Sequence, residues 1–377
     1  MNAQTKYWYW LGVLTGIGAK RAKQLLDIYG NAYEVFRQPK EAFTAYDFLS
    51  DIHVAQLSNP TLRTGIEDIL NELAGSGVGV VSMDDARYPE LLLEIDDPPP
   101  VLFYRGALPA ARGDRRIAIV GTRRPTAYGI TMTRKITAGL AGLGFTIVSG
   151  LAAGIDAIAH KAALDAGAKT IAVLGCGVDR AYPYENRRLM DAVIEAGSVY
   201  SEYPPGSAPF QQNFPRRNRL ICGMSIGIVV IEAGERSGAL ITAGYAGEQG
   251  RDIFAVPGNA TSPMSKGANA LLRDGAALVT SAEDIAFALN KYLCPSEISL
   301  FDIQEYKRAE SERRLAALNP EELKIARCLQ ERGPQDIDGI AGFCRLQAGA
   351  AASAAVMLEL KEIIRRQADG TYDFCDA

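Results

Sequence analysis

The sequence predicts an α/β protein whose central domain is an extended Rossmann-like, doubly wound and mostly parallel sheet. From Arg116 onward, short β-branched runs alternate with amphipathic or Ala-rich stretches; the runs are RIAIVG, FTIVSG, TIAVLG, SVYSEY, GIVVIEA, DIFAVPG and AALVTS. Strands and helices that alternate in this way form βαβ units, which build parallel sheets. At 377 residues the chain is also long enough for more than one domain.

Residues 1–80 predict an N-terminal helical domain. YWYWLGVL, TGIG and AKRAKQLLDIYG follow one another as a helix, a glycine turn and a second helix, the pattern of a helix-hairpin-helix or SAM-like unit. The amides that open the second helix, together with Lys20, Arg21 and Lys23, suit an anion. Short helical bundles also use such a turn simply to reverse direction, so both interpretations stay open.

Residues 81–114 predict an extended connector, because the prolines of DDPPPVLFYRGALP cannot continue a helix. The Rossmann-like core then spans 115–292, a polar linker 293–318 and a winged-helix domain 319–377. The last of these shows three helical stretches followed by QADGTYDF, a hairpin with Asp-Gly at its turn. Its acidic residues Glu359, Glu362 and Asp369 favour a role in binding a protein partner over reading DNA bases.

Composition argues against several classes of function. The six cysteines form no C-x-x-C pair and the chain has only two histidines, so we expect neither a metal site nor a cofactor. No early apolar stretch reaches the roughly 20 residues of a membrane span, and we expect a cytoplasmic protein. Residues 115–290 carry 18 Lys and Arg against 14 Asp and Glu in a chain of net charge −4, which allows a phosphate-bearing ligand on the core.

Candidate ligand contacts follow the predicted strands at their carboxyl ends, where open α/β sheets bind ligands. VGTRRPTAYG places Gly121, Thr122 and Arg123 after the first strand. The glycine permits close backbone approach, and the guanidinium and the helix amides beyond it suit a phosphate. The G-x-G-x-x-G fingerprint of dinucleotide binding is absent, which disfavours an oxidoreductase.

The segment SEYPPGSAPFQQNFPRRNRLICGMS carries the most specific signal. Aromatic rings beside guanidiniums and an amide suit single-stranded nucleic acid, because bases stack on the rings while arginines hold the backbone. In the alternative, the arginines pair with acids and Phe214 is part of the core, so that Phe210 is the stacking ring. The residues predicted to contact nucleic acid are Gly121, Thr122, Arg123, Gly150, Lys161, Asn186, Phe210, Phe214, Arg216, Arg217, Asn218 and Arg219.

Taken in order, VGTRRPTAYG, SGLAAGIDAIAHKAAL, FPRRNRLICGMS, ERSGALITA, GRDIFAVPGN and KGANALLRDGA resemble the DprA/Smf (DNA processing protein A) family. The resemblance implies a protein without catalytic chemistry that binds single-stranded DNA during natural transformation, protects it and loads RecA recombinase onto it. The family's Gly-Ser/Thr-Arg motif matches residues 121–123 and its Arg-Asn-Arg motif residues 217–219. Lysines found in some relatives are replaced here by Tyr184 and by Gln211 or Gln212, which weakens phosphate contact or shifts it to Arg216.

Two other functions stay open. Nucleotide phosphoribohydrolases of related fold carry P-G-G-x-G-T before a catalytic glutamate, whereas EAGERSGALITA here lacks the paired glycines. The second is a transcription regulator that reads duplex DNA with the terminal winged helix.

The stretch KGANALLRDGAALV predicts an apolar sheet edge that needs covering. We expect a homodimer whose twofold interface uses Leu272 and Leu278; alternatively, both leucines are core of one protomer. The family resemblance implies that this part of the core overlaps the surface offered to RecA, which here includes Gly247 and Arg273.

Overall fold

The computed structural model describes residues 4–108, 115–289, 311–312, 314–361, 363–367 and 369–375. The chain divides into two compact units, residues 1–294 and 295–377. Each unit is described by itself.

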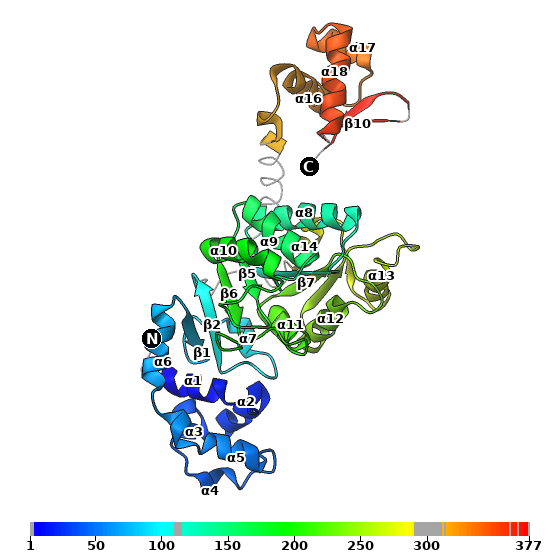
Figure 1. Ribbon diagram of the computed structural model, residues 1–377. Helices are drawn as coiled ribbons and strands as arrows, with labels where there is room; N and C mark the ends of the chain where they lie inside the picture. The colour runs from blue at the N-terminus through cyan, green and yellow to red at the C-terminus, as the bar shows by residue number, and fades with distance from the viewer. Residues whose placement is uncertain are drawn as a thin grey trace. The chain divides into compact units, whose positions relative to one another are not determined.

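The larger unit begins with a group of short helices (Figure 1). They are α1 (Thr5–Val13), α2 (Gly18–Tyr29), α3 (Ala32–Phe36), α4 (Lys40–Phe43), α5 (Asp51–Leu57), the 3₁₀ turn η1 (Pro60–Arg63) and α6 (Ile66–Gly75). Trp10, Leu25 and Phe43 are fully buried among them. The predicted helix, turn and helix are present, and the turn needs its glycines because Gly16 and Gly18 have φ of +84° and +60°.

A nine-stranded sheet forms the centre of this unit. Its strands are β1 (Gly79–Ser82), β2 (Val101–Gly106), β3 (Arg116–Val120), β4 (Thr146–Ser149), β5 (Thr170–Val173), β6 (Ser198–Ser201), β7 (Gly227–Val230), β8 (Asp252–Ala255) and β9 (Ala277–Leu278). Their order is β1-β2-β6-β5-β4-β3-β7-β8-β9. The seven strands from β3 to β9 are parallel and coincide with the seven predicted runs, which confirms the Rossmann-like α/β class.

The segment predicted as a connector, 81–114, differs from that expectation. It contains the short helix α7 (Glu90–Leu93) and β2, which pairs antiparallel with both β1 and β6. The run VLFYRG was predicted to be part of an extended connector because prolines flank it. In the structure its backbone pairs with the sheet as β2. Phe103, at 0% exposure, shows that this strand is part of the core.

Helices cover both faces of the sheet (Figure 1). On one face lie α8 (Ala127–Gly142), α9 (Ile155–Asp165), α10 (Arg187–Ala196) and α14 (Ala282–Leu289); on the other lie α7, α11 (Asn213–Gly223) and α12 (Gly238–Glu248). The 3₁₀ turn η2 (Tyr184–Asn186) precedes α10, and α13 (Lys266–Arg273) precedes β9. Because both faces are covered, every residue of β3 to β7 is buried.

The strand order reverses between β3 and β7. Strands β3 to β6 are added toward one edge of the sheet, and β7 to β9 are added toward the other. The loops that leave β3 and β7 therefore diverge to opposite faces and open a crevice at the carboxyl ends of these two strands. This switch point is where the fold positions a ligand site.

The smaller unit consists of α16 (Pro320–Arg332), α17 (Ile337–Cys344), α18 (Ala348–Leu360) and the hairpin of β10 (Ile364–Arg366) and β11 (Tyr372–Phe374). The sequence predicts three helices and a hairpin here, but it extends the third helix through Arg366, whereas the structure ends α18 at Leu360 and makes Ile364–Arg366 the first strand of the hairpin. Of the predicted linker, residues 293–310 lie outside the described residues, and Leu315 packs into the core of this unit. Within the described parts of the chain no single helix could cross a membrane; α17 and α18 meet that test only as a pair bent by 110°.

Candidate nucleic-acid interface

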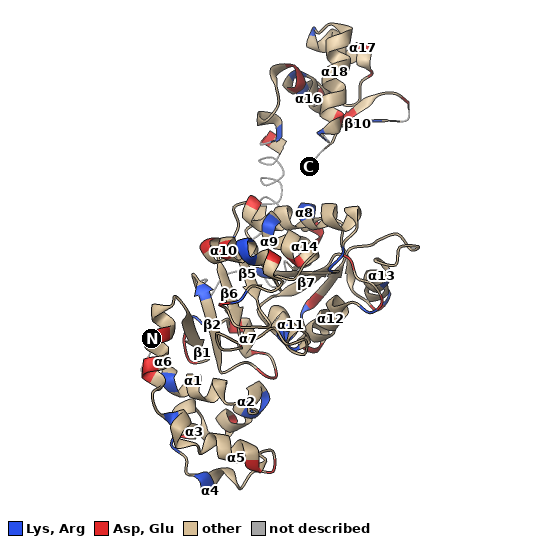
Figure 2. Ribbon diagram, viewed as in Figure 1, with Lys and Arg blue, Asp and Glu red and all other residues tan. Residues whose placement is uncertain are grey.

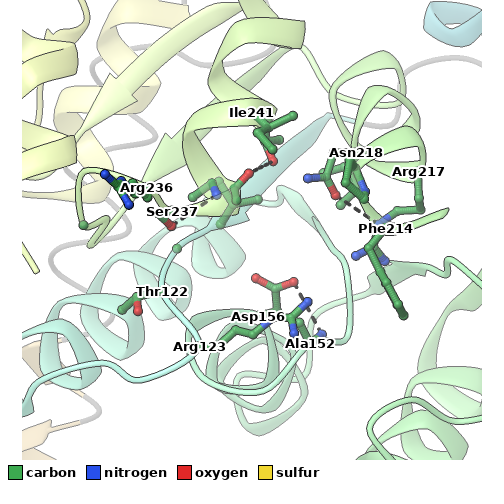
Figure 3. A pocket seen from close by; sticks show the side chains of 18 of the residues that line it. Thr122, Arg123, Ala152, Asp156, Phe214, Arg217, Asn218, Arg236, Ser237 and Ile241 are labelled. Carbon is green, nitrogen blue, oxygen red and sulfur yellow. Dashed lines mark hydrogen bonds between the residues drawn. The ribbon is translucent and has the colours of Figure 1, made fainter. Parts of the chain in front are cut away.

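A cleft of about 730 Å³ lies at the switch point (Figure 3). Its walls come from the loop after β3, the loop after β7, and the first turns of α11 and α12. Six of the predicted contact residues line it: Gly121, Thr122, Arg123, Phe214, Arg217 and Asn218. The strand ends named from the sequence therefore do meet in one place.

The loops after β3 and β7 are tied together beneath the cleft. The Thr122 amide donates to the carbonyl oxygen of Glu232 at 2.7 Å. The buried Glu232 carboxylate accepts from the Thr126 amide at 2.9 Å and from its hydroxyl at 2.6 Å. A Cβ on Gly121 would lie 2.6 Å from the Ile155 side chain, so only glycine fits there. The Glu232 carboxylate thus fixes the N-terminus of α8.

Arg217 is buried and is not an exposed contact. Together with Asp156 and Gly150 it forms a buried cluster next to the cleft, which we call the frame. The Arg217 side chain is only 4% exposed, and its Nη1 donates to the carbonyl oxygens of Gly150, at 2.7 Å, and of Val173. Asp156, also buried, accepts from the amides of Gly150 and Ala152 at 3.1 and 3.4 Å. Burial raises the pKa of Asp156 and lowers that of Arg217, while their mutual attraction opposes both shifts.

This frame also orients the side chain of Asn218. The Arg217 Nε donates to the Asn218 Oδ1 at 3.2 Å. The carbonyl of the amide group is then occupied, and its NH₂ group remains as a donor at the cleft wall. Arg217 therefore orients the side chain of Asn218, and Asn218 is the residue of the two that offers a free donor to a ligand.

The side chains of Phe214 and Phe210 differ in how much of the ring is free to stack on a base. Phe214 packs against Tyr182, with ring centroids 5.0 Å apart, and the Arg123 guanidinium lies 5.9 Å from the Phe214 centroid. Phe210, between the cleft residues Pro209 and Gln211, is 60% exposed. The arrangement favours Phe210 as the freer stacking ring, with Phe214 as part of the cleft wall.

Exposed cations stand on two sides of the cleft. Arg123 follows β3, and Arg236 follows β7; both line the cleft and both are exposed. In Figure 2, Lys and Arg are spread over many helices of the larger unit, so charge alone does not locate the site. Sequence reasoning missed Arg236, although GERSG directly follows the run GIVVIEA, which is a usable signal.

The other six predicted contacts do not line the cleft: Gly150, Lys161, Asn186, Phe210, Arg216 and Arg219. Arg219 is buried and paired with Glu202 and with Asp97, at 3.4 Å, on the side of α11 away from the cleft lining. Its guanidinium is thereby occupied, which argues against the predicted contact. Asn186 donates to the carbonyl oxygen of Leu151 at 2.9 Å. Lys161 on α9 and Arg216 on α11 are exposed but do not line the cleft.

Asn186 supports a strained backbone position. Leu151 has φ of +56°, a conformation that non-glycine residues rarely adopt, and its side chain is fully buried. The hydrogen bond from Asn186 fixes this residue in the loop between β4 and α9, beside the cleft residue Ala152. Asn186 therefore fixes the backbone next to the cleft without lining the cleft itself.

The residues of the expected dimer surface lie at the β9 edge of the sheet and on α12 and α13. Leu278, on the terminal strand β9, is 60% exposed, so it is not core of one protomer. Leu272 is half-buried, and Gly247 and Arg273 are exposed.

The fold and the cleft define an α/β protein of the Rossmann-like class with a basic and aromatic cleft at its switch point. Residues 79–290 match the family described as DNA recombination-mediator protein A. The protein Smf of Synechocystis sp. is 33% identical over 97% of this chain and 98% of its own length. The chain therefore belongs to the DNA recombination-mediator protein A family, which includes the proteins named DprA and Smf.

Two solved structures are similar to this one. The X-ray structure of DNA processing protein A from Streptococcus pneumoniae is 36% identical, has a TM-score of 0.63 and covers 76% of this chain and 98% of its own. A structure of DNA processing protein A from Helicobacter pylori, described as giving insight into its single-stranded DNA binding mode, is 30% identical, has a TM-score of 0.51 and covers 56% of this chain and 96% of its own.

Proposed function

We propose that this protein binds single-stranded DNA in the cleft at the switch point. The observation that carries the proposal is the meeting of the exposed Arg123, the Asn218 amide and the aromatic wall of Phe214 and Tyr182 in one cleft. Arginines suit the backbone phosphates, and rings suit bases that are not paired in a duplex. The relative from Helicobacter pylori, described by its single-stranded DNA binding mode, supports the same ligand class.

The role that fits this binding is protection of incoming single strands during natural transformation and loading of RecA recombinase onto them. We further propose that the protein acts in the cytoplasm as a homodimer and by binding alone, without a catalytic step or a cofactor. The surface around Gly247, Leu272, Arg273 and Leu278 is the proposed site for the second copy and for RecA.

The hydrolase alternative needs a free glutamate at the cleft, and neither nearby glutamate suits it. Glu232 is buried and its carboxylate accepts two hydrogen bonds from Thr126. Glu235 pairs with Lys266 at 3.2 Å. Incubation with nucleoside monophosphates should release no free base; release would favour the hydrolase.

The duplex-DNA regulator alternative depends on the smaller unit. Helix α18, AGAAASAAVMLEL, contains no Lys or Arg, and a helix that docks into a DNA groove normally contacts phosphates with such residues. This composition supports a protein-binding role for the unit.

The decisive experiment is a titration of fluorescein-labelled oligothymidine and of a duplex of equal length at one salt concentration. We expect the single strand to bind at least tenfold more tightly. Equal affinity for both, or tighter binding of the duplex, would reject the cleft as a single-strand site.

A further inference from the structure

We propose that Arg236 holds a second phosphate across the cleft from Arg123, so that the cleft brackets one nucleotide between two successive phosphates of a strand. This inference rests on the proposed function and assigns a ligand group to a residue that was not among the contacts predicted from the sequence. Ile241, which also lines the cleft, contacts the nucleoside.

The Arg236 guanidinium is available for a ligand. Its side chain is exposed, and among the described residues it has no ion-pair partner. The acids near it in the loop are engaged elsewhere: Glu235 pairs with Lys266 and Glu232 accepts from Thr126. The loop after β7 therefore exposes the Arg236 guanidinium at the cleft lining.

The two arginines belong to different walls. Arg123 follows β3 and reaches the Phe214 ring, whereas Arg236 follows β7 and directly precedes the start of α12. Figure 3 shows Arg236 on one side of the pocket and Phe214, Arg217 and Asn218 on the other. The positive end of the α12 dipole, at Gly238, adds to the charge on the Arg236 side.

The space between these walls suits a nucleoside. Ile241 lines the cleft and is 45% exposed, so its side chain offers apolar surface to a ligand there. Ile221 and Met264 add further apolar surface to the lining. The volume of 730 Å³ falls within the roughly 300–1,000 Å³ of small-ligand pockets, so the cleft has room for one nucleotide.

The test uses the full-length protein and two competitors of labelled oligothymidine, thymidine 5′-monophosphate and thymidine 3′,5′-bisphosphate. Two phosphate contacts predict that the wild type binds the bisphosphate at least fivefold more tightly. In Arg236→Ala this preference should fall below twofold, and Arg236→Glu should reverse it. The matched control is Arg134→Ala, an exposed arginine of α8 outside the cleft, which should leave the preference unchanged.

A second measurement uses the strand itself. The slope of log affinity against log salt should fall by about 0.7 in Arg236→Ala, the value for one phosphate contact on a single strand. If Arg236→Ala keeps both the salt slope and the bisphosphate preference while Arg123→Ala weakens binding, the second contact is refuted and the proposed function stands. If neither variant changes binding of the oligonucleotide, the proposed function fails as well.

Discussion

The guanidinium of Arg217 donates to the carbonyl oxygen of Gly150 at 2.7 Å, joining helix α11 to the carboxyl end of β4. The same side chain donates to Val173 at the end of β5 and to the Asn218 Oδ1. A Cβ on Gly150 would lie 2.5 Å from the Arg217 Nη2, so the arginine and the glycine depend on each other. This contact sets the shape of the cleft from below.

Replacing Arg217 should therefore act on stability first. Arg217→Ala leaves the buried carbonyl oxygens of Gly150 and Val173 without their donor and removes the positive charge near the buried Asp156; an unsatisfied buried polar group costs about 1–3 kcal/mol. Denaturant unfolding would measure the loss. Arg216→Ala, one residue earlier and exposed, is the control and should change stability by no more than about 0.5 kcal/mol. Equal stability of the two variants would contradict the frame role.

Arg123 should show the opposite behaviour. Its side chain is exposed at the cleft, so Arg123→Ala should lower single-strand affinity by more than tenfold and leave the thermal midpoint nearly unchanged. Fluorescence anisotropy and a thermal melt of the same preparation would separate the two effects. Unaltered affinity would exclude the loop after β3 as a DNA contact.

Binding should depend strongly on salt and weakly on base sequence. Arginine–phosphate contacts release counterions on binding, and ring stacking accepts every base. Titrations of oligothymidine and oligocytidine between 50 and 300 mM salt, roughly the range in which such slopes are resolved, would measure both dependences. A flat salt response, or strong preference for one base, would point to base-edge readout instead.

The sequence predicted the parallel strands well because each buried strand is a short β-branched run that a helical stretch separates from the next. All seven parallel strands were found, and the loops after β3, β4 and β7 meet as expected from the rule for carboxyl ends. β2 was missed because prolines on both sides of VLFYRG made a short strand resemble a connector. Its pairing with β6 is a long-range contact that no local pattern encodes.

The run Arg216, Arg217, Asn218 and Arg219 shows where the prediction of the site failed. The run was predicted to contact nucleic acid because guanidiniums and an amide stand beside aromatic rings, while the alternative had the arginines pair with acids. The structure buries Arg217 and Arg219 and exposes Arg216, because α11 packs against β5, α7 and α12. The partners that make this possible, Asp156, Glu202 and Asp97, are distant in sequence. Only the fold could identify them.

His160 gives a pH-dependent signature of the core beside the frame. Burial, with a smaller effect of the Arg217 charge, lowers the pKa of His160 to about 3. The Thr170 hydroxyl donates to the Ile147 carbonyl oxygen at 2.9 Å, so it accepts from the His160 Nδ1 at 2.7 Å. The folded protein therefore holds this imidazole neutral.

Stability should consequently fall as pH decreases from the unfolded pKa of 6.5 toward 3, because only the unfolded chain takes up the proton in that range. The loss from this group is about 1.4 kcal/mol per pH unit. Denaturant unfolding of wild type and His160→Gln at pH 7, 6 and 5 would isolate it, with the variant showing a slope shallower by that amount. Parallel slopes would mean that His160 is protonated in the folded state.

The last prediction concerns the edge of the sheet at β9. Leu278 lies on the terminal strand with 60% of its side chain exposed, and Ala277 beside it is exposed as well. An apolar strand edge left open in water invites pairing with another chain, and a self-complementary patch favours a closed pair of twofold symmetry. We therefore expect light scattering to give twice the chain mass of 40.5 kDa.

Leu278→Arg and Leu272→Arg should both convert this dimer to a monomer. Leu278→Arg is the cleaner variant, because its exposed side chain can change without disturbing the protomer, whereas Leu272 is half-buried. The Leu278→Arg variant should keep the thermal midpoint of an isolated folded protomer, and its mass by light scattering should be half that of the wild type. Arg134→Ala serves as the control on a different face and should remain dimeric. A wild-type monomer refutes the pairing, and a Leu272→Arg variant that unfolds while Leu278→Arg stays dimeric would assign Leu272 to the core and the interface to another surface.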